Sequence, residues 1–324
     1  MRVLPFATRD ASSFTALGPA LFDAAVASEH PHLAVSEITG PAVLLGASQR
    51  TERVVDLDAC TREHVAVTRR ATSGTAMYIG ENALGFTLAL PRVEALAPDA
   101  TLRTLVNRNV RGFLKGLTVL GALAHYFGRE WIAVQHRPIA IIGTTHDERG
   151  AAMLEVVAGL DTPVALPRTI AAPLERGLDR YQGKQPITLR DASSKLASLE
   201  NAAERFVTAF AARFGCPVEP ATLGRATDPG LERRTVELLP PASFVANEPV
   251  ACAIGYVEAA WSPDRGALWL GGDAWAPPHV LAMIAAAIRA NAVDALALED
   301  GAIEGARLDD YVRAALANAR VAPS

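Results

Sequence analysis

The chain has 324 residues, of which half are apolar and a fifth are charged, and its formal net charge is −4. A chain of this length can bury one large hydrophobic core or two smaller ones, so two domains are a reasonable expectation. The slightly acidic balance excludes a protein that binds polyanions over its whole surface. Nucleic acid is therefore not an expected partner, and any basic site must be local.

The three cysteines indicate the redox environment. Cys60, Cys216 and Cys252 form no C-x-x-C pair and have no metal-ligand spacing, and an odd number fits a reducing compartment better than a disulfide scaffold. Residues 1–14 lack the charged and then apolar pattern of a signal peptide, and no apolar stretch approaches the roughly 20 residues of a membrane span. We expect a cytoplasmic protein with no membrane partner and no metal site.

The first hundred residues contain one helical pattern and several strand patterns. Residues 13–29 have the apolar spacing of an amphipathic helix, and residues 34–49 read as two short strands. Residues 64–70, HVAVTRR, and residues 81–91, ENALGFTLALP, alternate as strands do. Between them lies a turn rich in small residues, RATSGTAMY.

Helices and hairpins are expected in the middle of the chain. Residues 99–121 should form a long helix with Asp99 as its N-cap and Gly121 just past its end. A hairpin, a further strand, a loop rich in proline and glycine, and a capped helix should follow, over residues 131–143, 151–160, 179–191 and 193–215.

The last third of the chain predicts a second domain. Two adjacent prolines and a loss of periodicity mark a linker in residues 235–250. Residues 254–273 carry a strong hairpin signal, and two helical stretches follow. Glycine turns connect the strands instead of βαβ alternation, and no dinucleotide or P-loop motif is present. We predict an α+β chain: a mixed-sheet domain flanked by helices over residues 1–240, and a small α+β domain of a hairpin plus helices over residues 241–324.

The stretch VTRRATSGTAMY places two arginines before a Ser-Gly-Thr turn. Arg69 and Arg70 are adjacent on a strand, so their side chains point to opposite faces and only one can reach a given pocket. Ser73, Gly74 and Thr75 offer backbone N–H groups that such a turn can direct at a carboxylate or phosphate. A hairpin turn with two solvated arginines has the same local pattern, so the stretch alone does not identify a site.

The order of motifs along nearly the whole chain resembles the lipoate-protein ligase and octanoyltransferase family. In that family a strand-G-x-x-Q segment precedes an R-R-x-S-G-G-G-x-V-Y-H turn, and here VLLGASQ precedes RRATSGTAMYI. A GRND-like strand start and a K-I-x-G strand follow in the family, where this chain has GREWIAV and HRPIAIIG. The stretch GYVEAAWSPDRGALWLGGDAW looks like the accessory domain of lipoate ligases.

The resemblance implies adenylation of a lipoyl or octanoyl carboxylate by ATP, and transfer of the acyl group to a lysine of a lipoyl-acceptor domain. It leaves open whether Mg²⁺ accompanies the ATP. It also implies an acyl-adenylate site with Gly143 on its opposite wall. The other residues of this expected site are Gly46, Gln49, Arg70, Ser73, Gly74, Thr75 and Ala76.

Several positions depart from the family pattern. Pro138 stands where the family has its pocket lysine, and a proline carries no charge and has no N–H to donate. Arg137 could supply the charge if a bulge at Pro138 re-aims its side chain. Lys184, in the loop YQGKQP, could do so by folding over the pocket. The stretch LDTPVALP contains no counterpart of the octanoyltransferase cysteine.

Three classes of function stay open. The chain is an acyltransferase or ligase with altered pocket chemistry, a non-catalytic member that binds an acyl or nucleotide ligand or a lipoyl domain, or a scaffold subunit with a filled pocket. The missing lysine separates the first class from the second. His146, Asp147 and Glu148 could bind a metal or act as acid and base, although adjacent polar residues after a strand usually form a turn.

Overall fold

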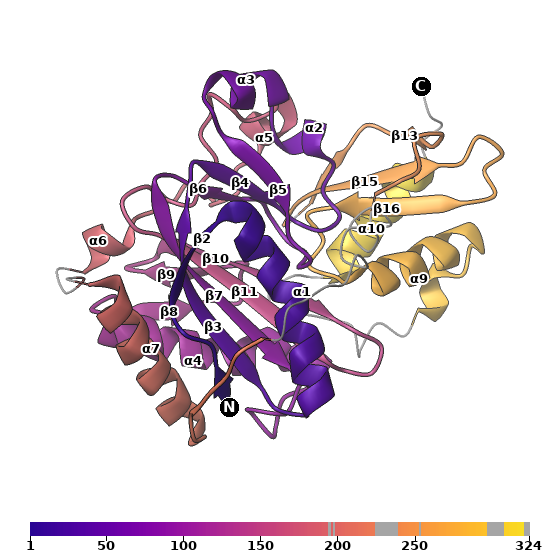
Figure 1. Cartoon of the computed structure of the whole chain (residues 1–324). Coiled ribbons are helices and arrows are strands. Elements are labelled where there is room, and N and C mark those ends of the chain that lie inside the picture. Colours follow the sequence, from indigo (N-terminus) through magenta and orange to yellow (C-terminus); the bar gives the residue numbers. More distant parts are fainter. Residues whose placement is uncertain (194–195, 197, 224–238, 253, 297–307, 321–324) are drawn as a thin grey trace.

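A large mixed sheet forms the centre of the molecule (Figure 1). The computed structural model of the chain describes residues 1–193, 196, 198–223, 239–252, 254–296 and 308–320. The strands of this sheet are β1 (Arg2–Val3), β2 (Ala7–Asp10), β3 (His32–Thr39), β7 (Asn82–Leu90), β8 (Ala124–Tyr126), β9 (Trp131–Val134), β10 (Arg137–His146), β11 (Ala152–Gly159) and β12 (Glu219–Pro220). Their order is β12-β1-β3-β7-β11-β10-β9-β8, and β2 also pairs with β3. β1, β2 and β12 run parallel to their partners, whereas the other pairs are antiparallel.

Helices cover both faces of this sheet because successive side chains of a strand point to opposite faces. α1 (Ala11–Ser28) packs on one face, where the Phe14 ring lies against Gly85 of β7. α4 (Leu105–Val119) and α7 (Leu199–Phe214) pack on the other face. There Phe86, the next residue of β7, stacks on Phe206 of α7 with 4.2 Å between the ring centroids.

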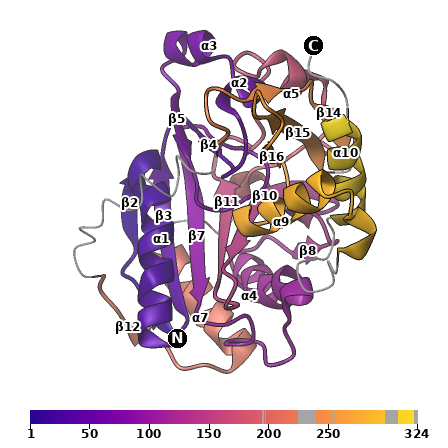
Figure 2. The same ribbon diagram turned by 90° about the vertical axis from the view of Figure 1, so that its right-hand side faces the viewer.

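A three-stranded sheet lies at one end of the large sheet. Its central strand β4 (Ala42–Leu45) pairs in parallel with β5 (Ala66–Arg69) and antiparallel with β6 (Met77–Ile79). Three short helices lie around it at the top of Figures 1 and 2: α2 (Thr51–Val54), α3 (Leu57–Arg62) and α5 (Pro173–Gly177). A fourth short helix, α6 (Leu189–Ala192), precedes α7. Because β4 and β5 are parallel, the segments that follow them leave the sheet at the same end.

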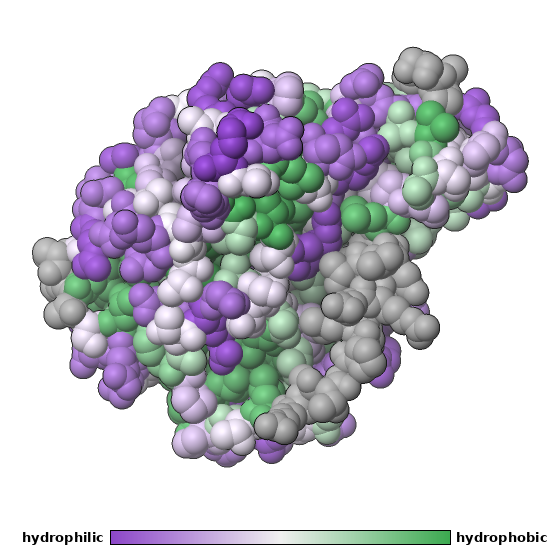
Figure 3. Space-filling model, turned by 45° about the horizontal axis from the view of Figure 1, so that its top comes forward, coloured by the Kyte–Doolittle hydropathy of each residue, from purple (hydrophilic) through white to green (hydrophobic). Residues whose placement is uncertain are grey.

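The C-terminal strands form a separate antiparallel sheet. β15 (Gly255–Trp261) pairs with β13 (Val245–Ala246), β14 (Val250–Cys252) and β16 (Leu268–Gly272). α9 (Pro278–Arg289) and α10 (Leu308–Arg320) pack on this sheet and complete a small apolar core. Figure 3 shows this part as a lobe at the upper right, with hydrophilic residues over much of its visible surface. The division of the chain at residue 240 stays a prediction.

Most expected elements are present where the sequence places them. The α+β class is confirmed. The hairpins β9-β10 and β15-β16 are both antiparallel pairs, as expected. α7 ends at Gly215 in the left-handed conformation, as expected, but it begins later than the expected residue 193, after Ser198, whose hydroxyl accepts the N–H of Asn201. Residues 235–238 of the expected linker lie outside the described residues. None of the described helices is long and apolar enough to cross a bilayer.

The expected N-cap of α4 is wrong. The carboxylate of Asp99 pairs with the guanidinium of Arg108 at 2.7 Å instead of capping the helix. Thr101 and Thr104 bond reciprocally and begin a 3₁₀ turn, η1 (Leu102–Thr104), which leads into α4. This capping box lies nearer to the helix than Asp99 and satisfies the first free N–H groups.

Candidate functional site

The two segments that carry the family motifs lie against each other. We call loop 46–49 and turn 70–76 together the motif junction. A Cβ atom on Gly46 would lie 2.0 Å from the carbonyl oxygen of Gly74, so only glycine fits there. Gln49 closes the loop, since its Oε1 accepts the N–H of Gly46 at 2.7 Å. The parallel pairing of β4 and β5 therefore brings together residues that are about 25 positions apart.

The two adjacent arginines point in different directions, as strand geometry predicts. Arg69 holds the backbone of loop 46–49: its NH1 donates to the carbonyl oxygens of Gly46 at 2.8 Å and Ala47 at 3.2 Å. Arg70 points into the interior and has no exposed surface. Arg69 thus has a structural role at the motif junction, and Arg70 is its buried cation.

Arg70 is held by hydrogen bonds rather than by an ion pair. Its NH1 donates to Thr72 Oγ1 at 3.0 Å and its NH2 donates to the carbonyl oxygen of Thr75 at 2.6 Å. Thr72 in turn bonds to the buried carboxyl of Glu155. Among the described residues, no carboxylate oxygen lies within 4.0 Å of the Arg70 guanidinium, and its Nε has no hydrogen-bond partner.

Burial sets the protonation of this pair. Loss of water lowers the pKa of Arg70 to about 10, although the nearby Glu155 works in the opposite direction. Burial also raises the pKa of Glu155, against the effects of Arg70 and Thr72. Burial thus disfavours the charged form of both groups, while the attraction between them favours it. The interior therefore contains a guanidinium that has no carboxylate at ion-pair distance among the described residues.

The expected site is covered by the C-terminal part of the chain. Ser73 donates its hydroxyl to the carbonyl oxygen of Ala276 at 2.7 Å, and its backbone pairs with Thr144 of β10. The Trp275 indole N–H donates to the carbonyl oxygen of Ile142 at 3.1 Å. A Cβ atom on Gly74, whose φ is +111°, would lie 2.7 Å from the Trp275 Nε1. Turn 70–76 is thus packed in the interior of this conformation.

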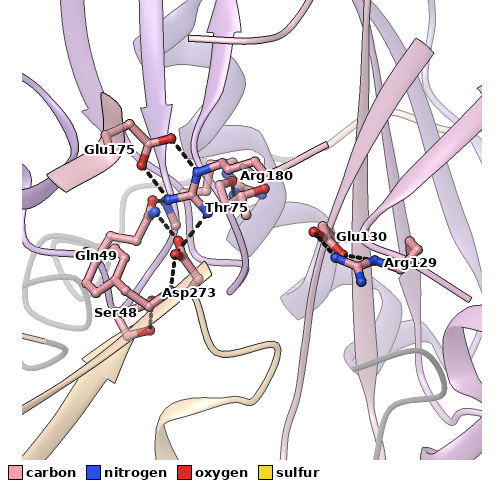
Figure 4. Close-up of polar contacts among 12 residues, drawn as sticks. Ser48, Gln49, Thr75, Arg129, Glu130, Glu175, Arg180 and Asp273 are labelled. Carbon is pink, nitrogen blue, oxygen red and sulfur yellow. Dashed lines mark hydrogen bonds and ion pairs between the residues drawn. The ribbon is translucent and has the colours of Figure 1, made fainter. Parts of the chain in front are cut away.

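A second buried contact joins Gln49 to the C-terminal part (Figure 4). Asp273 accepts hydrogen bonds from Gln49 Nε2 at 2.6 Å, from Arg180 NH1 at 2.9 Å and from the N–H of Tyr256 at 2.9 Å. The Arg180 guanidinium also bonds to both carboxylate oxygens of Glu175. Burial works to lower the pKa of Arg180, but the two carboxylates raise it well above its ordinary value.

The candidates for the missing cation lie away from the motif junction. β10 has a register shift between Pro138 and Ala140, which was the condition for re-aiming Arg137, but the Arg137 side chain stays exposed and its Nε donates to the carbonyl oxygen of Gln185 at 2.9 Å. Lys184 lies half-buried in the same loop, and no hydrogen bond or ion pair joins its ammonium group to the described residues. The register shift therefore does not turn Arg137 inward.

The other expected site residues are buried around Arg70. A Cβ atom on Gly143 would lie 1.9 Å from Arg70 NH1, so Gly143 borders the guanidinium directly. Ala76 is also buried.

The segment after His146 forms a turn, in which the Asp147 carboxylate accepts the N–H groups of Arg149 and Ala151 at 2.9 Å each.

Four residues of this region were not found from the sequence: Glu155, Arg180, Asp273 and Trp275. Glu155 is the one acidic residue in the apolar strand AAMLEVVAGL, and a lone acid in such a strand is a signal that could have been used. Arg180 and Asp273 come from segments far apart in the chain, and no local pattern relates them.

Comparison with known families decides the classification. Residues 14–212 match the family model described as the lipoyl protein ligase A/B catalytic domain. The chain belongs to this family. A comparison with curated proteins found no match. The matched range includes both segments of the motif junction, together with Gly143, Glu155 and Arg180.

Three solved structures illustrate the fold of this lipoyl protein ligase A/B family member. LipL1 of P. falciparum in complex with lipoate is 13% identical, with a TM-score of 0.65 over 87% of each chain. A bipartite lipoate protein ligase of Thermoplasma acidophilum, described with its E2 lipoyl domain, is 16% identical, with a TM-score of 0.55 over 74% of this chain and 92% of the other. A lipoate-protein ligase A bound with ATP is 17% identical, with a TM-score of 0.52 over 73% of this chain and 93% of the other. At these identities the likeness shows the fold.

Proposed function

We propose that this protein binds a lipoyl or octanoyl group as its acyl-adenylate at the motif junction and attaches it to a lysine of an acceptor domain. The observation that carries the proposal is Arg70, a buried cation with an unpartnered Nε and no carboxylate at ion-pair distance among the described residues. An acyl-phosphate anion would compensate this charge through charge-assisted hydrogen bonds. Glycines at 46, 74 and 143 let loop 46–49, Trp275 and the Arg70 guanidinium pack closely against the backbone of this region.

The likeness to solved ligases supports the choice of ligands. One of those proteins is bound with ATP and another is in complex with lipoate, and a third is described with a lipoyl domain. We carry ATP, a lipoate or octanoate substrate and a lipoyl-acceptor partner over to this chain as part of the proposal. Transfer of the acyl chain from water to an apolar site would contribute about 0.8 kcal/mol for each buried methylene. The presence of Mg²⁺ stays a prediction.

A second candidate is a non-catalytic member of the family, and Pro138 favours it. Pro138 is buried and offers neither charge nor N–H at the expected lysine position. Loss of one donor to the developing oxyanion typically lowers a rate by about 10²–10³. The packing of Trp275 on turn 70–76 is also what a subunit with a filled pocket would have. Ligand binding and acyl transfer must therefore be measured separately.

Intact mass of an apo acceptor domain after incubation with the protein, ATP and octanoate or lipoate tests transfer. Octanoyl-AMP binding by calorimetry tests the site itself. We expect Pro138→Lys to bind octanoyl-AMP like the wild type and to transfer the acyl group faster by about 10²–10³, the effect of one restored donor. Pro138→Ala is the matched control, because it removes the proline ring without adding a charge.

The outcomes separate the candidates. Transfer by the wild type establishes the ligase activity. Binding without wild-type transfer, together with a gain in Pro138→Lys alone, establishes a non-catalytic binder whose missing group is the lysine. Failure of both the wild type and Pro138→Lys to bind octanoyl-AMP rejects the proposed site.

A further inference from the structure

The Asp273 carboxylate accepts hydrogen bonds from donors in the C-terminal part and from donors in the larger part of the molecule. It follows β16, its side chain is buried, and its carboxylate accepts three hydrogen bonds. One donor, the N–H of Tyr256, belongs to the neighbouring strand β15. The other two, Gln49 Nε2 and Arg180 NH1, belong to the larger part of the molecule. Figure 4 shows Asp273 between Gln49 and Arg180, with Glu175 on the far side of Arg180.

The orientation of Gln49 is fixed independently of Asp273. Its Oε1 accepts the N–H of Gly46, which leaves Nε2 as a donor aimed at the Asp273 carboxylate. Gly46 in turn touches the carbonyl of Gly74. The Asp273 carboxylate is therefore held by the same glutamine that closes the motif junction.

The charges of this cluster favour exchange of one anion for another. Arg180 and Glu175 together are neutral, so the Asp273 carboxylate adds one net negative charge to a buried region. Without Asp273, the donors Gln49 Nε2 and Arg180 NH1 would both lack a partner, which is costly in the interior. Burial raises the pKa of Asp273 to about 6 even though Arg180 counteracts it. Burial therefore opposes the ionised form of this carboxylate, and its three hydrogen bonds favour it.

The alternative role of Asp273 is a purely structural ion pair. Glu258 of β15 forms such an ion pair in this protein. Glu258 is buried and its Oε1 accepts hydrogen bonds from Arg50 at 3.1 Å and Arg53 at 2.9 Å. It joins the same two parts of the molecule but does not bond to Gln49. Of these two buried carboxylates, Asp273 is the one that bonds to a residue of the expected site.

We infer that Gln49 and Arg180 form an anion subsite for a phosphate or carboxylate of the ligand, and that Asp273 occupies this subsite in the described conformation. The inference rests on the proposed function, because the ligand is the acyl-adenylate or its precursors. Binding of the ligand anion displaces Asp273 and loosens the hold of the C-terminal part on loop 46–49. Arg180 NH1 then donates a hydrogen bond to the ligand anion, while Glu175 continues to balance its charge.

Calorimetric titrations of the full chain with AMP, octanoate and adenosine test this inference. Asp273→Asn keeps the shape of the side chain and removes its charge. We expect it to bind AMP or octanoate about tenfold more tightly than the wild type, which corresponds to removal of a competitor favoured by about 1.4 kcal/mol. A gain for AMP identifies a phosphate subsite, and a gain for octanoate identifies a carboxylate subsite. Adenosine has neither group, so its binding should not change.

Two further variants separate the subsite from the interface. Glu258→Gln is the matched control, because it removes the other buried carboxylate at this interface and should not raise anion affinity. Adding Arg180→Met to Asp273→Asn should abolish the gain. Equal anion affinities of Asp273→Asn and Glu258→Gln, or a gain that survives Arg180→Met, would overturn the inference.

A measurement on the wild type does not depend on how the variants fold. Hydrogen exchange should become faster at the N–H of Tyr256 and in residues 268–277 when AMP or octanoate is saturating, because Asp273 has left. Unchanged or slower exchange there with bound anion would overturn the inference. Acyl transfer without any effect of Asp273→Asn rejects the subsite and keeps the proposed function. Anion binding that Asp273→Asn strengthens, without acyl transfer or octanoyl-AMP binding, keeps the subsite and rejects the proposed function.

Discussion

Gly143→Ala tests the role of the buried guanidinium at the motif junction. The added Cβ would lie 1.9 Å from Arg70 NH1 and 2.5 Å from Thr72 Oγ1, which is too close for either atom to stay in place. Arg70 is enclosed on all sides, so it cannot swing into water to avoid the methyl group. Displacement breaks its hydrogen bonds to Thr72 and to the carbonyl oxygen of Thr75.

The magnitude follows from these two bonds. A hydrogen bond to a charged group contributes about 1.5–3 kcal/mol, so losing both lowers the free energy of unfolding by about 3–6 kcal/mol. Total stabilities of domains are about 5–15 kcal/mol, so the loss should be plain in a thermal scan, with a fall in Tm on the order of 10 °C. Octanoyl-AMP binding should be lost as well, because Arg70 no longer faces the site.

Gly177→Ala is the matched control, since an added Cβ at Gly177 meets no atom within 4 Å. It lies in α5, where alanine is favoured over glycine by up to about 1 kcal/mol, so Tm should be unchanged or slightly higher. If Gly143→Ala kept the Tm and the ligand affinity of the wild type, this role of Arg70 would be refuted.

Two further predictions concern a surface arginine and a buried histidine. Arg137→Ala should leave octanoyl-AMP binding and acyl transfer unchanged, because this side chain is exposed; a loss of either in calorimetry or mass measurements would show that Arg137 reaches the ligand. Burial and the nearby His279 lower the pKa of His146, against the effect of Asp147. Below the ordinary pKa of histidine, the imidazole is therefore protonated more fully in the unfolded chain than in the folded chain. Stability should therefore fall as the pH drops below about 6.5, by at most about 1.4 kcal/mol per pH unit. His146→Gln should make Tm depend less on pH between about 7.5 and 5.5, and an unchanged dependence would contradict this assignment.

Much of the fold could be predicted because its signals are local. The period of apolar residues and the glycine at 215 define α7 and its end from its own sequence, whereas its start was expected at residue 193 and lies at Leu199. The hairpin β9-β10 is similar, because its strands lie next to each other in the chain. At the start of α4 the prediction of Asp99 as the N-cap was wrong, because Thr101 and Thr104 form a capping box a few residues further on.

The candidate site was harder to predict because its contacts join distant segments. The motif order placed Gly46, Gln49 and Arg70 together, and the parallel pairing of β4 with β5 explains why they meet. No pattern in the sequence indicated that the indole of Trp275 lies on Gly74, some 200 residues earlier in the chain. The sequence pointed to Arg137 as a substitute for the lysine because Arg137 is next to Pro138 in the chain, and no local pattern pointed to Arg180.

The two buried arginines of the motif region have opposite electrostatic states, and this difference is informative. Arg180 is paired with two carboxylates, which raise its pKa, whereas Arg70 has none at ion-pair distance among the described residues and its pKa is lowered. If both arginines served only stability, each would be expected to have a carboxylate partner, because an unpaired buried charge is destabilising. A site that receives an anion from outside does need such a cation, and it also needs a way to hold the charge balance before the ligand arrives. In the described conformation the C-terminal part places Trp275 on the turn and the Asp273 carboxylate on Gln49 and Arg180, and Arg70 keeps no carboxylate at ion-pair distance among the described residues.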